Sequence, residues 1–475
     1  MIIKDNPESI LSYLEDSSNF KEGKAEKVFI PEEEKEIIEI VKYCSSKKIP
    51  LTISGGGTGT VGGRIPKEGF VISTEKLDKI KNIDIENKVA ILESGVVIDN
   101  FLKILDKESL FYPPFPTERS AFIGGNVSTN ASGEYSFKFG ATRKYIKKIR
   151  MILSNGKILE IERGKCFEKN GIIEIEDLRI PIPSYRTPQI KCSAGYYSFP
   201  GMDFIDLIIG SEGTLGIITQ IEVRLIEKLP DRFIMVMFFN SDERILELLK
   251  LIKQKKELEV YTLEYFDKES LFFLKKDFPE IPGNSSAIYV EGVSNKEKIE
   301  IWMDIIEEFK VKDTWVGEDE KNYKRLIDFR HKLPENVNSY FKKIGSVKMA
   351  VDVSVPEENF PSLYNFYKEI MKKETIRMIL FGHIGENHLH FNFFPKDEQE
   401  KIKTLEIYKS CIEKGIHLNG TVSAEHGIGK LKHKWLRMMY GEKGIREMAI
   451  IKKFFDPFCI LGLDNIFPKE VLSEI

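Results

Sequence analysis

Cysteine is scarce in this chain, with five residues among 475, and none of them forms a CxxC pair. Thiolate zinc sites and iron–sulfur clusters need closely spaced cysteines, so this scatter argues against both kinds of site. A reducing compartment fits such usage. We therefore expect a cytoplasmic protein, with peripheral attachment to the inner membrane left open. The five residues are Cys44, Cys166, Cys192, Cys411 and Cys459.

Long apolar runs are missing as well. No stretch approaches the roughly 20 apolar residues that a membrane span needs. The charged start MIIKDNPESILSYLED lacks the basic-then-apolar order of a signal peptide. With 42% hydrophobic residues, 31% charged residues and a net charge of -3, the composition is that of a water-soluble globular protein. No broad basic field is available for nucleic acid. A length of 475 residues predicts two or three domains.

The first part of the chain predicts alternating helices and strands. Pro31–Lys48 combines a favourable first helical residue with apolar side chains at helical spacing. The pattern then predicts strands at Leu51–Ile53, Val71–Ser73 and Val89–Glu93 and a helix at Ile98–Asp106. Asn155-Gly156 lies between two apolar runs, which predicts a hairpin with two positive-φ turn positions.

The character of the sequence changes after Pro230. Phe233–Phe239 is a compact apolar strand, and Ser241–Lys256 has the pattern of an amphipathic helix. We therefore predict a second α+β domain that runs to about Asn419. The remaining tail carries one loop motif and then helical segments.

Glycine is concentrated in one loop. The decapeptide Ser54–Gly63 (SGGGTGTVGG) carries six glycines, which tolerate positive φ and let backbone N–H groups converge on an anion. Part of it matches the GxGxxG pattern of Rossmann proteins, but such a loop must open a helix. Here Pro66 and a further predicted strand follow. We therefore predict a pyrophosphate cradle of a non-Rossmann kind.

Two further glycine clusters, Phe122–Asn126 and Gly210–Gly216, suggest backbone that lies against a large flat ligand. The segments GGGTGTVGG, FYPPFPTERSAFIGGNVSTNASG, IGSEGTLGIIT, GHIGENHLH and AEHGIG occur in the order found in FAD-dependent D-2-hydroxyacid dehydrogenases. The chain resembles this family, which includes the D-lactate, glycolate and D-2-hydroxyglutarate dehydrogenases of the vanillyl-alcohol oxidase / p-cresol methylhydroxylase (PCMH) superfamily. The resemblance extends from about Glu26 to Phe467.

The resemblance implies a bound FAD. Some relatives attach the flavin through a histidine in the N-terminal half, and this chain has no histidine before His331, so we expect non-covalent FAD. Composition leaves cysteine attachment at Cys166 or Cys192 open, although neither lies in a linkage motif. By resemblance, the pyrophosphate is held by Ser54, Gly55, Gly56, Gly57, Thr58, Gly59, Thr60, Gly62 and Gly63. The rest of the cofactor is expected to contact Pro116, Thr117, Gly124, Gly125, Asn126, Thr129, Gly140, Ala141, Thr142, Glu212, Gly213, Gly216, Ile217 and Ile218.

All seven histidines lie at or after His331, and four of them fall into two short clusters. If the segment from 388 to 392 is extended, its two histidines and Asn392 point to one side, and the apolar residues between them pack on the other. The second cluster is Glu425-His426. Two imidazoles and a carboxylate suit a borderline divalent ion.

The resemblance assigns roles within these clusters. It implies a divalent metal (zinc, manganese or iron) on His383, His390 and Glu425, and it makes His426 the general base. The remaining His331, His417 and His433 are expected in solvent or in the core, with His331 the least certain because it follows Arg330. The chain reads GENH where relatives usually read GDGN, so His388 replaces an amide side chain. Its role as an additional ligand is left open.

Oxidation of a hydroxy acid needs a carboxylate anchor, loss of the hydroxyl proton and hydride transfer from C2 to flavin N5. Arg330 is the expected anchor because a guanidinium binds a carboxylate bidentately, and Lys348 is a second candidate. The metal would lower the pKa of the substrate hydroxyl. His426 would then take the proton and FAD the hydride.

Two alternatives stay open. An alkylglycerone-phosphate-synthase-like transferase would use the flavin to join carbons without net oxidation, although such proteins carry a different histidine-rich loop. A flavin-binding electron-transfer subunit would have no substrate of its own. The electron acceptor could be a quinone, an electron-transfer flavoprotein or a partner subunit, and a homodimer is left open.

The resemblance also implies the fold class, which is α+β. We expect a two-subdomain, non-Rossmann FAD-binding domain of PCMH type at residues 1–228. An α+β substrate cap domain with an antiparallel sheet should follow at 229–420. Residues 421–475 should form a C-terminal helical return that completes the active site.

Overall fold

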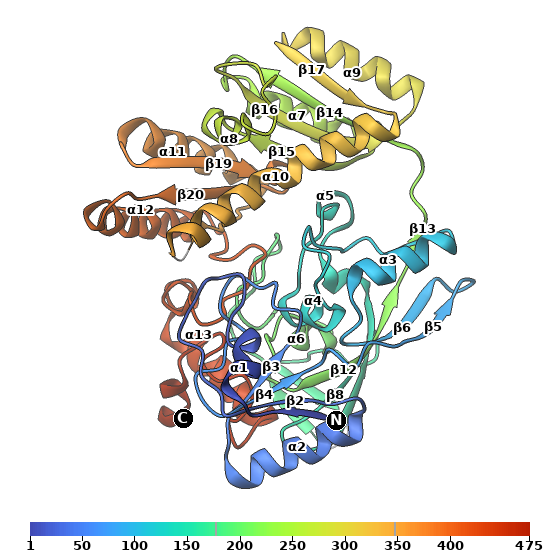
Figure 1. The fold of residues 1–475 in the computed structure, drawn as a ribbon, viewed down its shortest axis with the longest axis vertical. Helices are drawn as coiled ribbons and strands as arrows, with labels where there is room; N and C mark the ends of the chain where they lie inside the picture. Colours follow the sequence, from blue (N-terminus) through green and yellow to red (C-terminus); the bar gives the residue numbers. More distant parts are fainter. Residues whose placement is uncertain (176–177, 346–347) are drawn as a thin grey trace.

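The computed structural model describes residues 1–175, 178–345 and 348–475. The chain forms two bodies stacked along the long axis of the molecule (Figure 1). The lower body carries a four-stranded and a five-stranded sheet, and the upper body carries a seven-stranded sheet. Both chain termini lie in the lower body. The C-terminal segment therefore returns from the upper body to the lower one.

The four-stranded sheet has the order β1-β2-β4-β3, in which β2, β4 and β3 are parallel. Helix α2 (Glu34–Lys47) packs its apolar stripe of Ile37, Val41 and Cys44 against this sheet. No helix of the described residues lies between β3 and β4, which confirms that the glycine loop is not a Rossmann loop. The strands are β1 (Ile2–Lys4), β2 (Lys27–Ile30), β3 (Leu51–Ser54) and β4 (Phe70–Ser73).

The five-stranded sheet is antiparallel, with the order β5-β6-β12-β8-β9. Helix α3 (Ile98–Lys107) lies where the sequence predicts it and buries Ile98, Phe101 and Leu105. The strands are β5 (Ile80–Asp84), β6 (Val89–Glu93), β8 (Ile146–Ile152), β9 (Ile158–Glu162) and β12 (Ile217–Arg224).

The predicted hairpin joins β8 to β9, but its turn differs from the prediction. Only Gly156 has a positive φ (79°). The N–H of Gly156 donates to Leu153 O, and the N–H of Leu153 donates to Lys157 O. This is a type I turn followed by a left-handed glycine. Asn155 therefore keeps an ordinary backbone, and its side-chain oxygen instead accepts the N–H of Lys157 at 2.9 Å.

The seven-stranded sheet is antiparallel throughout, with the order β17-β14-β16-β15-β19-β20-β18. Alternate residues of β14 enter opposite cores, because successive side chains of a strand point to opposite faces. The strands are β14 (Arg232–Phe239), β15 (Val260–Phe266), β16 (Ser286–Val293), β17 (Asp313–Gly317), β18 (Met349–Val351), β19 (Arg377–Gly382) and β20 (His390–Phe394).

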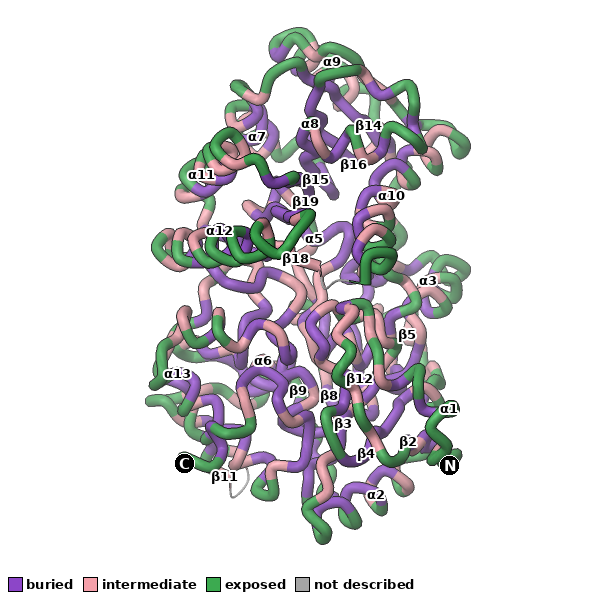
Figure 2. Tube along the Cα trace, turned by 60° about the vertical axis from the view of Figure 1, so that its left-hand side comes forward, coloured by how far each residue is buried: buried purple, intermediate pink, exposed green. Residues whose placement is uncertain are grey.

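Helices cover both faces of this sheet. Two pack on the face that carries Ile234 and Phe238, namely α8 (Lys268–Leu274) and α10 (Glu320–Ile344). The others, whose apolar residues join the opposite core, are α7 (Ile245–Gln254), α9 (Lys296–Glu308), α11 (Phe360–Lys373) and α12 (Glu398–His417). Figure 2 shows the result: buried strands and exposed outer sides of α9 and α12.

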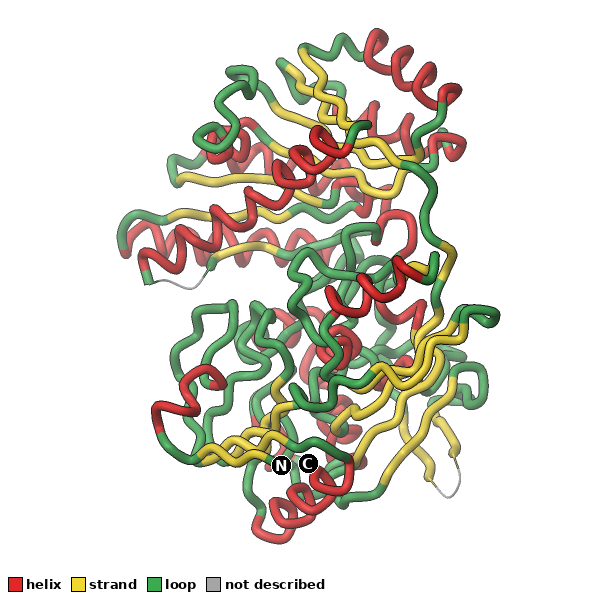
Figure 3. Tube along the Cα trace, turned by 45° about the vertical axis from the view of Figure 1, so that its right-hand side comes forward, coloured by secondary structure: helices red, strands yellow, loops and turns green. Residues whose placement is uncertain are grey.

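Short elements and loops fill the region between the sheets (Figure 3). The helices there are α4 (Ile123–Thr129), α5 (Ser136–Phe139) and α6 (Ile205–Ile208), whereas α1 (Pro7–Ile10) packs on the four-stranded sheet. The small strands form the pairs β7 (Leu110–Phe111) with β13 (Ile226–Glu227) and β10 (Ile172–Ile175) with β11 (Leu178–Pro181). In the described parts of the chain, we find no helix long and apolar enough to cross a bilayer.

The C-terminal segment ends in α13 (His433–Phe455), which is kinked at Gly441 (φ 68°, ψ 175°). Beyond it, Ile460 O accepts the N–H of Leu51 at 2.7 Å, and the N–H of Gly462 donates to Leu51 O at 3.0 Å. The tail thus extends the edge of the four-stranded sheet at β3. This is the helical return that the resemblance implies, and the α+β architecture is confirmed.

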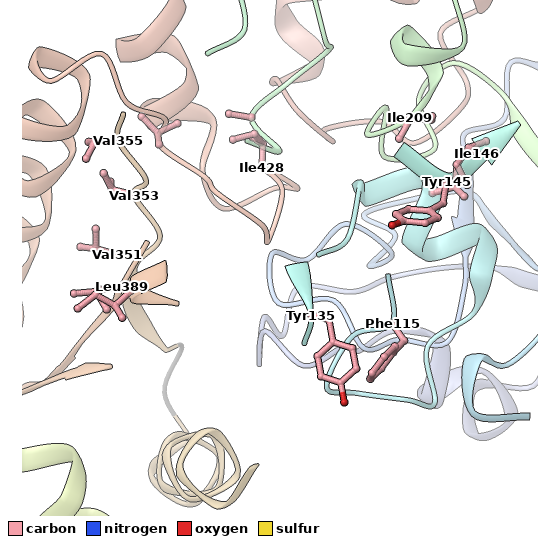
Figure 4. Packing of buried hydrophobic residues seen from close by; sticks show 14 of the residues in the cluster. Phe115, Tyr135, Tyr145, Ile146, Ile209, Val351, Val353, Val355, Leu389 and Ile428 are labelled. Atoms are coloured by element: carbon pink, nitrogen blue, oxygen red, sulfur yellow. The ribbon is translucent and has the colours of Figure 1, made fainter. Parts of the chain in front are cut away.

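A continuous apolar core links the two bodies. On the lower side, the rings of Phe115 and Tyr135 pack edge to face at 5.3 Å. On the upper side, Val351, Val353 and Leu389 belong to the same cluster (Figure 4). Apolar side chains of both bodies therefore pack together where the two bodies meet.

Candidate active site

A cavity of ≈ 480 Å³ lies between the two bodies. The lower body contributes the glycine loop of residues 55–63 and the loops around Gly124 and Glu212. The upper body contributes Glu264, Arg330 and the histidine loop. The predicted cofactor cradle and the predicted metal cluster therefore border one space.

Several glycines of the cradle face this cavity without being needed for packing. No heavy atom of the described residues lies within 4 Å of a Cβ built at Gly59 or Gly125, and the nearest atom is 3.9 Å away at Gly55 and Gly63. Side chains at these positions would project into free space. Bare backbone here allows close approach of a large flat ligand.

Arg64 holds the glycine loop in place. Its Nε donates to Glu15 O at 2.8 Å and its Nη1 to Gly55 O at 3.0 Å, so the loop is tied to the N-terminal segment. A Cβ on Gly57 would lie 2.5 Å from the Arg64 guanidinium carbon, and the φ of Gly57 is +78°. Only glycine fits there. The sequence pattern did not single out Arg64.

Most of the expected cofactor residues border the cavity, and a minority do not. Thr142 is one exception: its hydroxyl donates to Ala131 O at 2.7 Å, which turns the side chain into the core. Cys192, one of the two cysteines considered for flavin attachment, donates to Thr421 Oγ1 at 3.2 Å and is also outside the lining. The expected residues outside the lining are Ser54, Gly62, Gly140, Ala141, Thr142 and Ile217.

Glu264 connects Arg330 to the histidine loop. One oxygen of this buried carboxylate, Oε1, accepts Arg330 Nη2 at 2.7 Å and Nε at 3.1 Å, and lies 3.0 Å from His383 Nδ1. Burial alone would raise the pKa of Glu264, but Arg330 and His383 hold it well below its usual range. Glu264 lies on β15, in the middle of the upper sheet, so it is rigidly placed.

His383, His390 and Glu425 meet as predicted. Glu425 Oε2 lies 3.4 Å from His383 Nε2, and Oε1 lies 3.3 Å from His390 Nε2. Burial would lower the pKa of His383, but Glu264 and Glu425 together raise it to about 9, whereas burial lowers the pKa of His390 to about 3. Lys191 Nζ, which is 2.8 Å from Glu425 Oε2, helps to hold the pKa of Glu425 well below its usual range against the effect of burial.

His426 is oriented by Asp352. Two groups of His426 face the Asp352 carboxylate. The ring Nδ1 lies 3.0 Å from Asp352 Oδ2, and the backbone N–H donates to the same oxygen at 3.2 Å. The ring Nε2 faces Glu425 Oε1 at 3.6 Å. Lys432 Nζ donates to the same Asp352 oxygen at 2.8 Å. Burial would raise the pKa of Asp352, but His426 and Lys432 hold it well below its usual range.

The two expected anchors differ in their surroundings. Arg330 lies between two buried carboxylates, because Glu134 Oε1 is 3.8 Å from Nη1 in addition to the Glu264 contacts. Burial would lower the pKa of Arg330, but these carboxylates raise it. Lys348 also borders the cavity and makes a long contact of 3.4 Å with Asn338 Oδ1, and burial lowers its pKa to about 8. His331 lies 2.9 Å from Glu134 and borders the cavity, unlike the solvent or core position expected for it.

Sequence reasoning missed Glu264, Asp352, Glu134 and Lys191 as parts of this site. For two of them the sequence holds a signal: Glu264 and Asp352 are single acids inside apolar strand segments, YTLEYF and MAVDVSV. A buried charge must be paired, so an acid in such a run indicates a nearby cation or metal ligand. No local pattern marks Glu134 or Lys191.

The donor set fits a divalent ion. The ligand atoms of His383, His388, His390 and Glu425 all lie within 4.8 Å of one another. A zinc-like ion with bonds of about 2.0–2.3 Å fits between atoms so spaced. Glu264 on the far ring nitrogen of His383 is the outer carboxylate that metal-binding histidines commonly have.

We expect Gly382→Ala to damage the metal cluster specifically. Gly382 has a φ of +112°, and a Cβ there would lie 2.8 Å from His390 Cδ2. Strain of this kind costs roughly 1–3 kcal/mol, and the clash would push His390 away from Glu425. We expect a lower melting temperature and weaker metal binding. The matched control is Gly345→Ala, where φ is +64° but no heavy atom of the described residues is near. Unchanged metal affinity in Gly382→Ala would show that His390 can relax.

Sequence profiles of two families match the chain. The profile described as FAD binding domain matches residues 25–162. The profile described as FAD linked oxidases, C-terminal domain, matches residues 229–462. The glycine loop lies in the first match, and the histidine and glutamate cluster lies in the second.

Individual proteins match over nearly the full length. The chain is 28% identical over 476 residues to the glycolate oxidase subunit GlcD of Bacillus subtilis (strain 168), covering 98% of this chain and 94% of that one. It is 29% identical over 450 residues to a D-lactate dehydrogenase of Anaerostipes hadrus, covering 91% and 87%.

Solved structures share the fold. The 4-ethylphenol oxidase from Gulosibacter chungangensis superposes with a TM-score of 0.69 at 15% identity, covering 99% of this chain and 95% of that chain. An alkyldihydroxyacetonephosphate synthase gives a TM-score of 0.67 at 15% identity, covering 97% and 81%. At such identity the likeness shows the architecture alone, so it does not choose between oxidation and group transfer.

Proposed function

The chain belongs to the FAD linked oxidases of PCMH type, and we propose that it oxidises a small D-2-hydroxy acid to the corresponding 2-oxo acid. It is an FAD-linked oxidoreductase of the D-lactate, glycolate and D-2-hydroxyglutarate dehydrogenase type. The observation that carries the substrate proposal is the shared cavity, in which the glycine cradle and the Arg330, His383 and Glu425 cluster border one space. A flavin on the cradle and an acid in the cluster would be neighbours.

Bound FAD supplies the two-electron acceptor for the hydrogen at C2, and a divalent ion at the cluster supplies a Lewis acid for the hydroxyl. We propose that His383, His390 and Glu425 hold this ion, which is zinc, manganese or iron. FAD would be held without a covalent bond by the glycine loops. We also propose that the chain is divided into an FAD-binding domain (1–228), a substrate cap domain (229–420) and a C-terminal segment that completes the active site (421–475).

His426 is the proposed base for the hydroxyl proton. Asp352 accepts at the Nδ1 side of the ring, which keeps a proton there and leaves Nε2 as the acceptor toward the cavity. The 28% exposure of the His426 side chain gives it access to that space. The proton therefore passes from the hydroxyl oxygen to His426 Nε2.

Lys348 and Arg330 are the proposed anchors for the carboxylate. Arg330 Nη1 is the less engaged end of its guanidinium, 3.4 Å from Thr117 Oγ1. Among the described residues, the Lys348 ammonium forms no ion pair with a carboxylate and approaches the amide oxygen of Asn338 at 3.4 Å. A substrate carboxylate between them would compensate the buried ammonium, because a buried charge is costly without a partner.

Anaerobic titration tests this function. We expect one acid from a panel of D-lactate, D-2-hydroxyglutarate and the achiral glycolate to bleach the flavin absorbance, and the L-enantiomers of the two chiral acids to do so much more slowly. Removal of the metal with a chelator should suppress bleaching, and added zinc, manganese or iron should restore it. Full bleaching in a chelated enzyme that holds no metal would reject the metal site. No bleaching by any acid would leave the transferase or the electron-transfer subunit as the better interpretation.

A further inference from the structure

His388 is the one histidine of the cluster without an assigned role. Its side chain is fully buried at 0% exposure. Among the described residues, neither ring nitrogen has a hydrogen-bond partner. An imidazole that is withdrawn from water and left without partners is unfavourable. The described residues therefore leave a ring nitrogen available to a ligand other than the protein.

The position of the ring indicates what that partner is. One ring nitrogen of His388 lies within 4.8 Å of the ligand atoms of His383, His390 and Glu425. The ring centroid is 5.4 Å from that of His383 and 4.7 Å from that of His390. Three imidazole nitrogens and a carboxylate oxygen gathered this closely can bind one ion.

Asp352 supplies the outer contact for the same ring. Its Oδ1 lies 2.9 Å from His388 Nε2, but outside the hydrogen-bonding direction of that nitrogen, so both atoms stay unpartnered. The other carboxylate oxygen is already shared by His426 and Lys432. The ligand atoms that gather with that of His388 are those of His383, His390 and Glu425, so we place the ion on the Glu425 side of the ring.

The loop that carries His388 is fixed, so the ring cannot easily swing away. The backbone N–H of His388 donates to His383 O at 3.3 Å, and residue 388 pairs with Ser354. A Cβ on Gly385 would lie 2.7 Å from the Phe137 ring, which shows how closely the loop packs on α5. Lys191 Nζ and Ser136 Oγ both donate to Glu386.

We infer that His388 is a fourth protein ligand of the metal ion, which makes the site three imidazoles and one carboxylate. This inference rests on the metal site of the proposed function. A nitrogen-rich set favours zinc, cobalt, nickel or iron over manganese, because carboxylate and water suit manganese better. It also leaves fewer open positions for the substrate than a site with three protein ligands.

The test counts imidazoles in the zinc-loaded holoenzyme by extended X-ray absorption fine structure. We expect three imidazoles in the wild-type protein and two in His388→Asn. Competition with a chromophoric chelator should show zinc binding weakened at least roughly 10-fold in the variant, the effect of losing even an outer partner of a metal site. His417→Asn, at the exposed end of α12, is the matched control and should keep three imidazoles and wild-type affinity.

The possible results distinguish the inference that His388 is a ligand from the proposed metal site itself. Two imidazoles in zinc-loaded wild-type protein would overturn the inference and leave the proposed metal site standing. If the protein binds no zinc at all, both the inference and the proposed metal site are overturned. Flavin bleaching by a hydroxy acid tests the proposed oxidation separately. The wild-type count needs no variant, so poor folding of His388→Asn would not obscure the answer. Flavin absorbance and the melting temperature report whether that variant is folded.

Discussion

Replacing His426 by alanine is expected to lower the rate constant of flavin reduction by roughly 10²–10⁴-fold, which is the usual contribution of a positioned base. The ring is held by Asp352 at 3.0 Å and touches the cavity, so it can accept a proton from a bound hydroxyl. The variant removes only the ring, and the backbone of the same loop keeps its hydrogen bonds to Glu212 and Val61, so FAD should stay bound. Stopped-flow mixing of the oxidised variant with substrate measures the effect directly.

Two further measurements make this experiment specific to proton transfer. Added imidazole should restore part of the rate, because a small base can occupy the space left by the ring. His417→Ala should reduce its flavin at the wild-type rate, since that side chain is exposed at the C-terminal end of α12. An unchanged reduction rate constant in His426→Ala would remove His426 from the chemistry.

The cofactor side of the site could be predicted from sequence because its signal is local. Six glycines between Ser54 and Gly63 have few uses other than exposing backbone to a ligand. Pro66 shows from the sequence alone that no helix follows, and the structure has none there. The residues missed in this region are those that support the loop, such as Arg64, whose contacts reach Glu15 far away in sequence.

The substrate side was predicted only in part, because its residues come from distant elements. His383, His390 and Glu425 were expected together and meet within 3.3–3.4 Å. Glu264, from another strand of the same sheet, could not be placed beside His383 without the strand order. Pairing of β15 with β19 is what brings these two residues into contact.

The helix that carries Arg330 shows the same limit. Helix α10 extends from Glu320 to Ile344 and includes Pro334, a residue that usually ends or kinks a helix. A proline inside a helix leaves the carbonyl four residues earlier without its usual donor, and here that carbonyl belongs to Arg330. Buried packing of α10 against the sheet outweighs this local penalty. Pro334 also borders the cavity.

We expect Glu264→Gln to weaken metal binding and substrate binding together. One oxygen of the Glu264 carboxylate contacts both Arg330 and His383. The same negative charge therefore supports the proposed substrate anchor and a proposed metal ligand. Removal of an outer carboxylate usually costs roughly 10–100-fold in metal affinity. Arg330 would keep only the 3.8 Å contact with Glu134 as compensation, and loss of a buried ionic partner costs roughly 3–5 kcal/mol of folding free energy.

The matched control is Glu291→Gln on the neighbouring strand β16. Glu291 is also buried and lies 3.3 Å from Arg232, but it contacts neither Arg330 nor His383 and does not border the cavity. Zinc competition, the KM for the hydroxy acid and the melting temperature should be measured for both variants. Only Glu264→Gln should change the first two. If the KM rises while zinc affinity stays at the wild-type value, then Arg330 and the metal ligands are positioned independently, and the shared oxygen of Glu264 does not couple them.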